Sequence, residues 1–174
     1  MKENIKRLRE LTGFGIIDCK KALDNSLGDL DKAILSLKEK GARILEKKSE
    51  RQVKEGLVDA YVHFSQSLAA MVEVNCETDF VARSGDFKRF VKDLSMHIAA
   101  VAPKYVSSKD VPGSELSGLD EEEKKEYYKK NCLLNQPYVK DNSKTIADYL
   151  NETAAKFREN IVIRRFVRFS LGNE

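Results

Sequence analysis

Cys76 is the residue whose type and neighbours could best support covalent chemistry. It stands between Asn75 and Glu77, and a thiol acts as a nucleophile when a nearby base takes its proton. The two histidines of the chain, His63 and His97, are the candidate bases. A small Cys at the end of an apolar strand is more often simply buried, so the sequence favours a structural cysteine over a thiol enzyme.

Three lysine pairs could contact phosphate groups: Lys20-Lys21, Lys47-Lys48 and Lys129-Lys130. Acidic neighbours accompany the last two, and the chain carries 31 basic and 28 acidic residues, a net charge of +3. Nucleic-acid-binding domains are normally more basic, and single-strand binders interleave aromatic residues. The pattern favours solvated helix faces, so no direct nucleic-acid contact is expected. An RNA- or ribosome-binding protein is the rival hypothesis.

The cysteine content and hydropathy indicate where the protein works. Cys19, Cys76 and Cys132 are odd in number and widely spaced, which fits neither a disulfide framework nor a zinc site. The sequence has no apolar signal core, no run near the roughly 18 apolar residues of a membrane span, and no phosphate- or metal-binding motif. It therefore predicts a cytoplasmic protein, or one of an organelle matrix after loss of a targeting segment, without membrane anchor, metal or cofactor.

The run from Val74 to Ala82 (VNCETDFVA) resists a purely structural interpretation. It leaves an apolar strand shortly before an amphipathic helix, and Thr78 or Asp79 could cap a short helical turn with Phe80 at its tip. Phe80 could fold back into the core, as most aromatic residues do. It could also stand exposed as an anchor for another protein. The sequence leaves both interpretations open.

Residues 1–41 predict a compact module of three short helices. The apolar residues at helical spacing are Ile5, Leu8 and Leu11 in the first helix, Ile16, Cys19 and Leu23 in the second, and Leu30, Ala33, Ile34 and Leu37 in the third. Asp29 is placed to cap the third helix, and Gly41 to end it as its C′ residue. The charged stretch 42–55 that follows is either a linker or a helical extension.

Residues 56–174 predict the main core, with two alternating strands around the connector 65–67. The residues expected to share the core face are Val58, Ala60, Val62 and Phe64 on the first strand, and Leu68, Ala70, Val72 and Val74 on the second. A third strand runs from Ile161 to Phe169. The opposite face, with Leu57, Tyr61 and Met71, is also apolar, so a partner subunit is one candidate to cover it.

A long helix after Ser84 is the clearest element of the sequence, and Pro103 stops it. Its apolar stripe is Phe87, Phe90, Val91, Leu94, Ile98 and Val101. Two more helices are expected, one from Asp120 to about Leu134 and one from Ser143 to Phe157. The predicted fold class is α+β: an N-terminal three-helix module followed by a small antiparallel three-stranded sheet covered by helices.

Four stretches resemble the elongation factor Ts family, the guanine nucleotide exchange factors of elongation factor Tu. They are Leu11-Thr12-Gly13-Phe14-Gly15-Ile16-Ile17-Asp18-Cys19-Lys20-Lys21-Ala22-Leu23, the run from Val74 to Ala82, Leu133 to Asp141, and Glu159 to Phe166. The resemblance spans nearly the whole chain. It implies a protein that acts by binding and is not an enzyme.

The resemblance also implies residue roles. The N-terminal module is similar to ubiquitin-associated (UBA-like) domains, and Arg9, Ile16, Ile17 and Lys20 would dock on the GTPase of elongation factor Tu. Thr78, Asp79, Phe80 and Val81 would press beside its magnesium site, with Phe80 as a wedge that displaces Mg²⁺ and GDP.

The chain resembles the short form of the family, in which two copies can pair through their sheets, so a homodimer is expected. Phe14 fills a position that is usually small in the family, and Arg158 stands where a glycine often precedes Glu-Asn.

Overall fold

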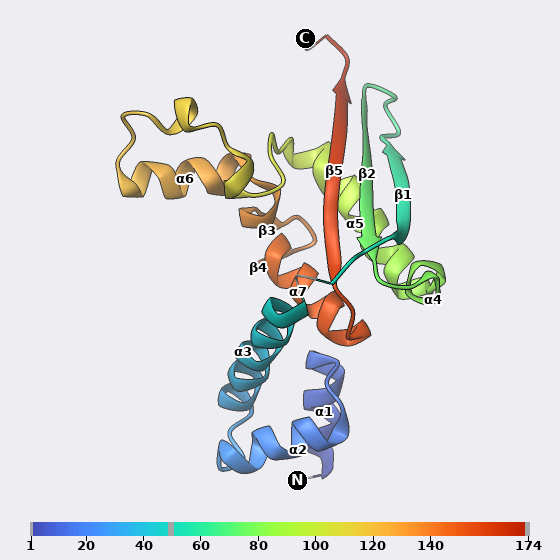
Figure 1. The fold of residues 1–174 in the computed structure, drawn as a ribbon, viewed down its shortest axis with the longest axis vertical. Helices are drawn as coiled ribbons and strands as arrows, with labels where there is room; N and C mark the ends of the chain where they lie inside the picture. The colour runs from blue at the N-terminus through green and yellow to red at the C-terminus, as the bar shows by residue number, and fades with distance from the viewer. Residues whose placement is uncertain (1, 49–50, 173–174) are drawn as a thin grey trace. The chain divides into compact units, whose positions relative to one another are not determined.

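The computed structural model describes residues 2–48 and 51–172, which form two compact units. The first unit comprises Met1–Gln52 and Leu150–Asn160, and the second comprises Val53–Tyr149 and Ile161–Glu174. Helices α1–α3 open the chain, and a three-stranded antiparallel sheet with helices packed against it forms the second unit (Figure 1). The predicted α+β class is confirmed.

The first unit is built on helices α1 (Lys2–Thr12), α2 (Ile16–Asn25) and α3 (Leu30–Lys48). Its buried core consists of Leu8, Cys19, Ala22, Leu23, Ala33 and Leu37. Asp29 caps α3 as predicted, because its Oδ1 accepts hydrogen bonds from the backbone N–H groups of Asp31 and Lys32, both at 3.1 Å.

The prediction that Gly41 ends the third helix is wrong, because α3 continues through it to Lys48. Gly41 is buried, and a Cβ added to it would lie 3.4 Å from Cζ of Phe14. The glycine therefore makes room for an aromatic ring instead of terminating the helix. The side chains of Lys47-Lys48 and residues 49–50 of the predicted stretch 42–55 lie outside the described part of the chain.

The sheet of the second unit has the order β1-β2-β5, from β1 (Glu55–Val62), β2 (Leu68–Cys76) and β5 (Ile161–Ser170). Helix α5 (Gly85–Val101) contacts all three strands and covers one face of the sheet (Figure 1). The predicted stripe of α5 is buried except for Val101, which is 39% exposed. Ala70, Val72, Val74 and Cys76 of β2 face this helix and are buried.

The predicted core face of the first strand is wrong. In the register, Leu57 pairs with Val74 and Tyr61 pairs with Ala70, so these residues of β1 share the helix-covered face. The predicted series lies on the other face, where Val58 and Val62 are more than 60% exposed; Phe64, beyond the strand, is also exposed. The helix-covered series includes the charged residue Asp59, whose Oδ1 lies 4.0 Å from Nζ of Lys92 on α5, so the more apolar series was not the one that the helix covers.

Helix α4 (Asp79–Arg83) directly precedes α5, and the other elements lie between α5 and β5 in the sequence. They are η1 (Ser108–Asp110), η2 (Gly113–Leu116), α6 (Glu121–Asn131), η3 (Leu133–Asn135), β3 (Pro137–Tyr138), β4 (Asp141–Thr145) and α7 (Ile146–Phe157). Asp120 caps α6, which ends three residues before the predicted Leu134. The last helix begins at Ile146 and not at Ser143, because residues 141–145 pair with β3.

Gly56 offers a direct test of the pairing between β1 and β2. Its φ is 153°, and an added Cβ would overlap the carbonyl oxygen of Val74 and lie 2.8 Å from Cα of Asn75. We expect Gly56→Ala to lower the free energy of unfolding by more than about 2 kcal/mol, measured by urea denaturation. Gly85→Ala is the matched control, since an added Cβ there meets nothing within 4 Å. Equal stability of the two variants would contradict the register.

Candidate partner-binding site

The run singled out in the sequence forms a capped tip at the end of β2. Helix α4 (Asp79–Arg83) follows the strand, and Oγ1 of Thr78 caps it by accepting a hydrogen bond from Val81 N at 3.4 Å. The Phe80 side chain is 83% exposed, whereas Val81 and Ala82 beside it are buried. The alternative in which Phe80 folds back into the core is therefore wrong.

Cys76 anchors the start of this tip. The residue is fully buried, and its Sγ donates a hydrogen bond to the carbonyl oxygen of Thr78 at 3.2 Å. The candidate bases have other roles. His63 Nδ1 lies 3.0 Å from the Tyr61 hydroxyl, and buried His97 bonds through its two ring nitrogens to Gln136 and to the backbone of Val139. These contacts support the structural cysteine over the thiol enzyme.

Burial also lowers the pKa of His97, and its hydrogen bond with Gln136 opposes this shift only in part. The ring is therefore held neutral near neutral pH. Its Nδ1 accepts from Val139 N at 3.3 Å, which requires that nitrogen to be unprotonated. His97 thus acts as a packing and hydrogen-bonding residue between α5 and the segment before β4.

Two charges flank the exposed ring on α4. Asp79 and Arg83 form an i,i+4 ion pair with 3.1 Å between Oδ2 and Nη2, and their side chains are 42% and 81% exposed. Such a pair adds little stability in water. It matters for binding, because a carboxylate that enters an interface with its own cation has a smaller cost of desolvation. Sequence reasoning missed Arg83, although its spacing of four from Asp79 was a visible signal.

The four residues assigned to docking in the N-terminal module all lie in the first unit. Ile16 and Ile17 begin α2 and are 58% and 71% exposed, and Arg9 and Lys20 are exposed as well. Ile16 therefore does not join Cys19 and Leu23 in the packed core as predicted. Burial raises the pKa of the Cys19 thiol, and a hydrogen bond with Thr12 is the main effect that opposes this shift. Exposed isoleucines beside a cation are typical of a binding surface.

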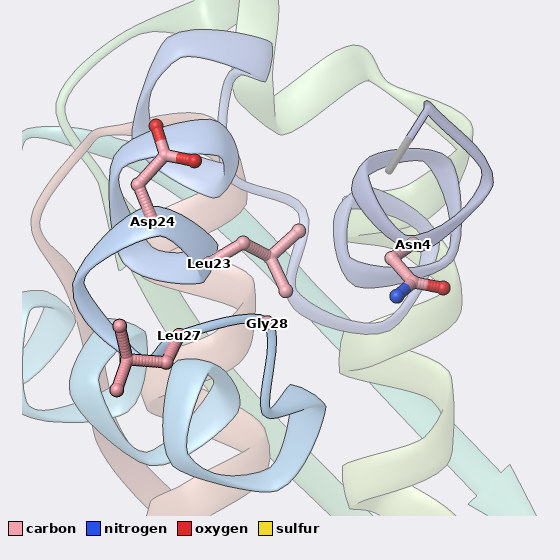
Figure 2. Close-up of a pocket in the computed structure, with 5 residues that line it drawn as sticks. All are labelled: Asn4, Leu23, Asp24, Leu27 and Gly28. Carbon is pink, nitrogen blue, oxygen red and sulfur yellow. The ribbon is translucent and has the colours of Figure 1, made fainter.

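A hollow of about 280 Å³ lies in the same unit, between α1 and the loop that joins α2 to α3. Figure 2 shows the residues that line it: Asn4, Leu23, Asp24, Leu27 and Gly28. Leu27 is 96% exposed. The lining offers a single carboxylate, so it lacks the convergent polar groups of a cofactor site.

The sheet face away from α5, here called the open face, is largely apolar. Its exposed residues are Val58, Val62, Met71, Val167 and Phe169. They surround one ion pair, in which Arg165 Nε lies 2.8 Å from Oε2 of Glu73, and this contact lowers the pKa of the Glu73 carboxyl. A hollow of about 230 Å³ lies beside the pair. A contiguous apolar face of this kind is typical of a protein interface.

The described residues contain no group of three metal-ligating side chains, and none of their helices combines the length and apolar character needed to cross a bilayer. An exposed aromatic tip and exposed apolar surfaces define a protein that acts by contacting other proteins. The fold and these surfaces give the class: a binding protein.

Comparison with known proteins gives the family. The family model described as Elongation factor TS matches residues 30–125 and 123–173. The chain is 49% identical to an elongation factor Ts of Thermoanaerobacter sp. (strain X514), over 97% of this chain and 93% of that protein. It is 44% identical to the one of Geobacter metallireducens, over 97% of this chain and 88% of that protein. The chain belongs to the elongation factor Ts family, the nucleotide exchange factors of elongation factor Tu, which act by binding and not as enzymes.

The contrast between Phe80 and Val81 gives a stability prediction. Phe80→Ala removes an exposed ring, so we expect the free energy of unfolding to change by less than about 0.5 kcal/mol. Val81→Ala removes buried methyl groups and should cost roughly 1.5–3 kcal/mol. Urea denaturation of both variants measures the difference. Comparable losses would mean that the Phe80 ring packs inside the protein.

Proposed function

We propose that the chain releases GDP from elongation factor Tu by pressing the Phe80 tip beside the magnesium site of that GTPase. Thr78, Asp79, Phe80 and Val81 form the pressing element, and GTP binds after Mg²⁺ and GDP have left. The observation that carries this proposal is the 83% exposure of Phe80 directly before the buried residues Val81 and Ala82. An exposed ring on an anchored backbone is suited to enter another protein without unfolding its own.

The free energies involved show that the Phe80 tip alone is not sufficient for exchange. Burying one Phe side chain contributes roughly 1.5–3 kcal/mol, whereas a thousandfold faster release needs about 4 kcal/mol of barrier. Exchange is a negative coupling between two ligands of one protein, so the nucleotide must weaken the exchange factor's binding by the same factor. Additional contacts must therefore hold the tip in place.

Arg9, Ile16, Ile17 and Lys20 are the proposed source of those contacts. Their exposed surface combines two apolar side chains with two cations, which suits an acidic and apolar patch on the GTPase domain. Docking by this surface raises the effective concentration of the tip at its target, because both belong to one chain. The tip then acts on the GTPase as part of an already bound protein.

Exchange kinetics test this function. Elongation factor Tu is loaded with fluorescent GDP, and the release rate is followed as the exchange factor is titrated to saturation. We expect Phe80→Ala to lower the maximal release rate at least tenfold, because the ring is lost at the point of action. Ile17→Ala should mainly raise the half-saturating concentration, since it weakens docking. Unchanged release with the wild-type chain at saturation would remove the proposed function.

The open face supports a second part of the proposal, a homodimer. Two copies related by a two-fold axis would bring the same surface together twice, so Met71 and Val167 of each copy would be covered. The surface is self-complementary in charge, because Glu73 is already neutralised by Arg165. The second copy is thus the proposed cover of the apolar face.

The homodimer predicts the effect of one added charge. We expect Met71→Glu to shift the sedimentation coefficient from dimer to monomer at micromolar concentration, because each dimer would bury two unpaired carboxylates. Val139→Glu is the matched control, since Val139 is similarly exposed (44% against 47%) but lies outside the open face. A monomeric wild-type chain, or equal effects of both variants, would contradict this interface.

The proposed place of action is the bacterial cytoplasm, or an organelle matrix. The relatives compared above come from bacteria, and a translation factor works where ribosomes are. No direct contact with nucleic acid is proposed, because the net charge is only +3. The partners are elongation factor Tu and a second copy of the chain.

A further inference from the structure

Ser84 occupies the single position between the tip helix and the long helix of the core. It is the C-terminal cap of α4 and also the N-terminal cap of α5. Its backbone is extended, with φ −67° and ψ 145°, so the chain changes direction at this residue. The connection between the tip helix and α5 therefore consists of this one residue.

The Ser84 hydroxyl makes one hydrogen bond to each helix. As an acceptor, Oγ takes a hydrogen bond from Phe87 N at 3.2 Å, which is the ordinary capping bond of α5. As a donor, Oγ binds the carbonyl oxygen of Val81 at 2.8 Å. The same carbonyl also accepts Ser84 N at 3.0 Å, so Ser84 supplies two donors to one acceptor at the end of α4. One side chain thus links the two helices.

Helix α4 depends on such contacts, because a helix of five residues does not form by its own propensity. Its first turn is fixed by the Thr78 cap, and Val81 and Ala82 bury the side facing the core. The bond to Val81 acts on the residue next to Phe80. This carbonyl belongs to the peptide that joins Val81 to Ala82, so a change in its angle is passed through Val81 to the exposed ring of Phe80.

We propose that Ser84 is a positioning residue for exchange: its donated hydrogen bond to Val81 fixes the direction in which Phe80 projects. The proposal rests on the function assigned above to Phe80. The Ser84 hydroxyl then has two separate roles. Accepting from Phe87 stabilises the fold, and donating to Val81 aims the tip.

Three substitutions separate these roles. Ser84→Thr keeps both bonds. Ser84→Asp keeps the cap, because a carboxylate accepts from Phe87 N, but it has no proton to donate to Val81. Ser84→Ala loses both. The thermal unfolding temperature shows whether the capping bond to Phe87 N is kept. The maximal rate of fluorescent GDP release from elongation factor Tu shows whether Phe80 projects in the right direction.

We expect Ser84→Thr to exchange within about twofold of wild type and Ser84→Asp to retain wild-type stability. The maximal rate of Ser84→Asp should fall about fivefold, the rate equivalent of one ordinary hydrogen bond, with an unchanged half-saturating concentration. Ser84→Ala should lose both rate and thermal stability. Wild-type exchange by Ser84→Asp would overturn the positioning role.

A double-mutant cycle shows whether the effect passes through the ring. If Ser84 acts by aiming Phe80, Ser84→Asp causes no further slowing once Phe80→Ala is present. An equal slowing in both backgrounds would overturn the inference while leaving the function of Phe80 intact. Wild-type exchange by Phe80→Ala alone would instead remove the proposed function, and the positioning role with it.

Discussion

The structure of the tip depends on one constraint: Val81 and Ala82 are buried while Phe80, next to them in the chain, stays in water. A single helical turn points neighbouring side chains in different directions, so anchoring one side of α4 exposes the other. The Thr78 cap, the Cys76 thiol and the Ser84 hydroxyl hold that turn in place. The ring is exposed because the burial of its neighbours fixes its direction, and not because the ring itself favours water.

In this arrangement one surface acts on the GTPase, and other surfaces of different chemistry supply binding affinity. The tip carries a single exposed aromatic ring, whereas Ile16, Ile17 and the open face each add further exposed apolar side chains. Reciprocal coupling explains why such a division is useful. An exchange factor must leave when nucleotide rebinds, so the acting group should be specific and small, with affinity supplied from elsewhere.

The sequence predicted an element correctly where its residue pattern fits only one structure. The stripe of α5 and the buried series of β2 were evident from their periods, and the cap by Asp29 followed from local chemistry. It failed where tertiary packing chose between two equivalent local options. In β1 the series that contains Asp59 is the one that the helix covers, and Gly41 suits a helix end as well as a close approach of Phe14. The exposure of Phe80 was undecided for the same reason, because burial of its neighbours is a property of the whole fold.

The most direct test of the central claim measures GDP release from elongation factor Tu with Mg²⁺ present and after chelation by EDTA. The wild-type chain and Phe80→Ala are compared at saturation under both conditions. If the ring acts by displacing the groups that hold Mg²⁺, the ratio of their release rates is large with Mg²⁺ and falls toward one without it. A ratio that stays the same after chelation would contradict the account.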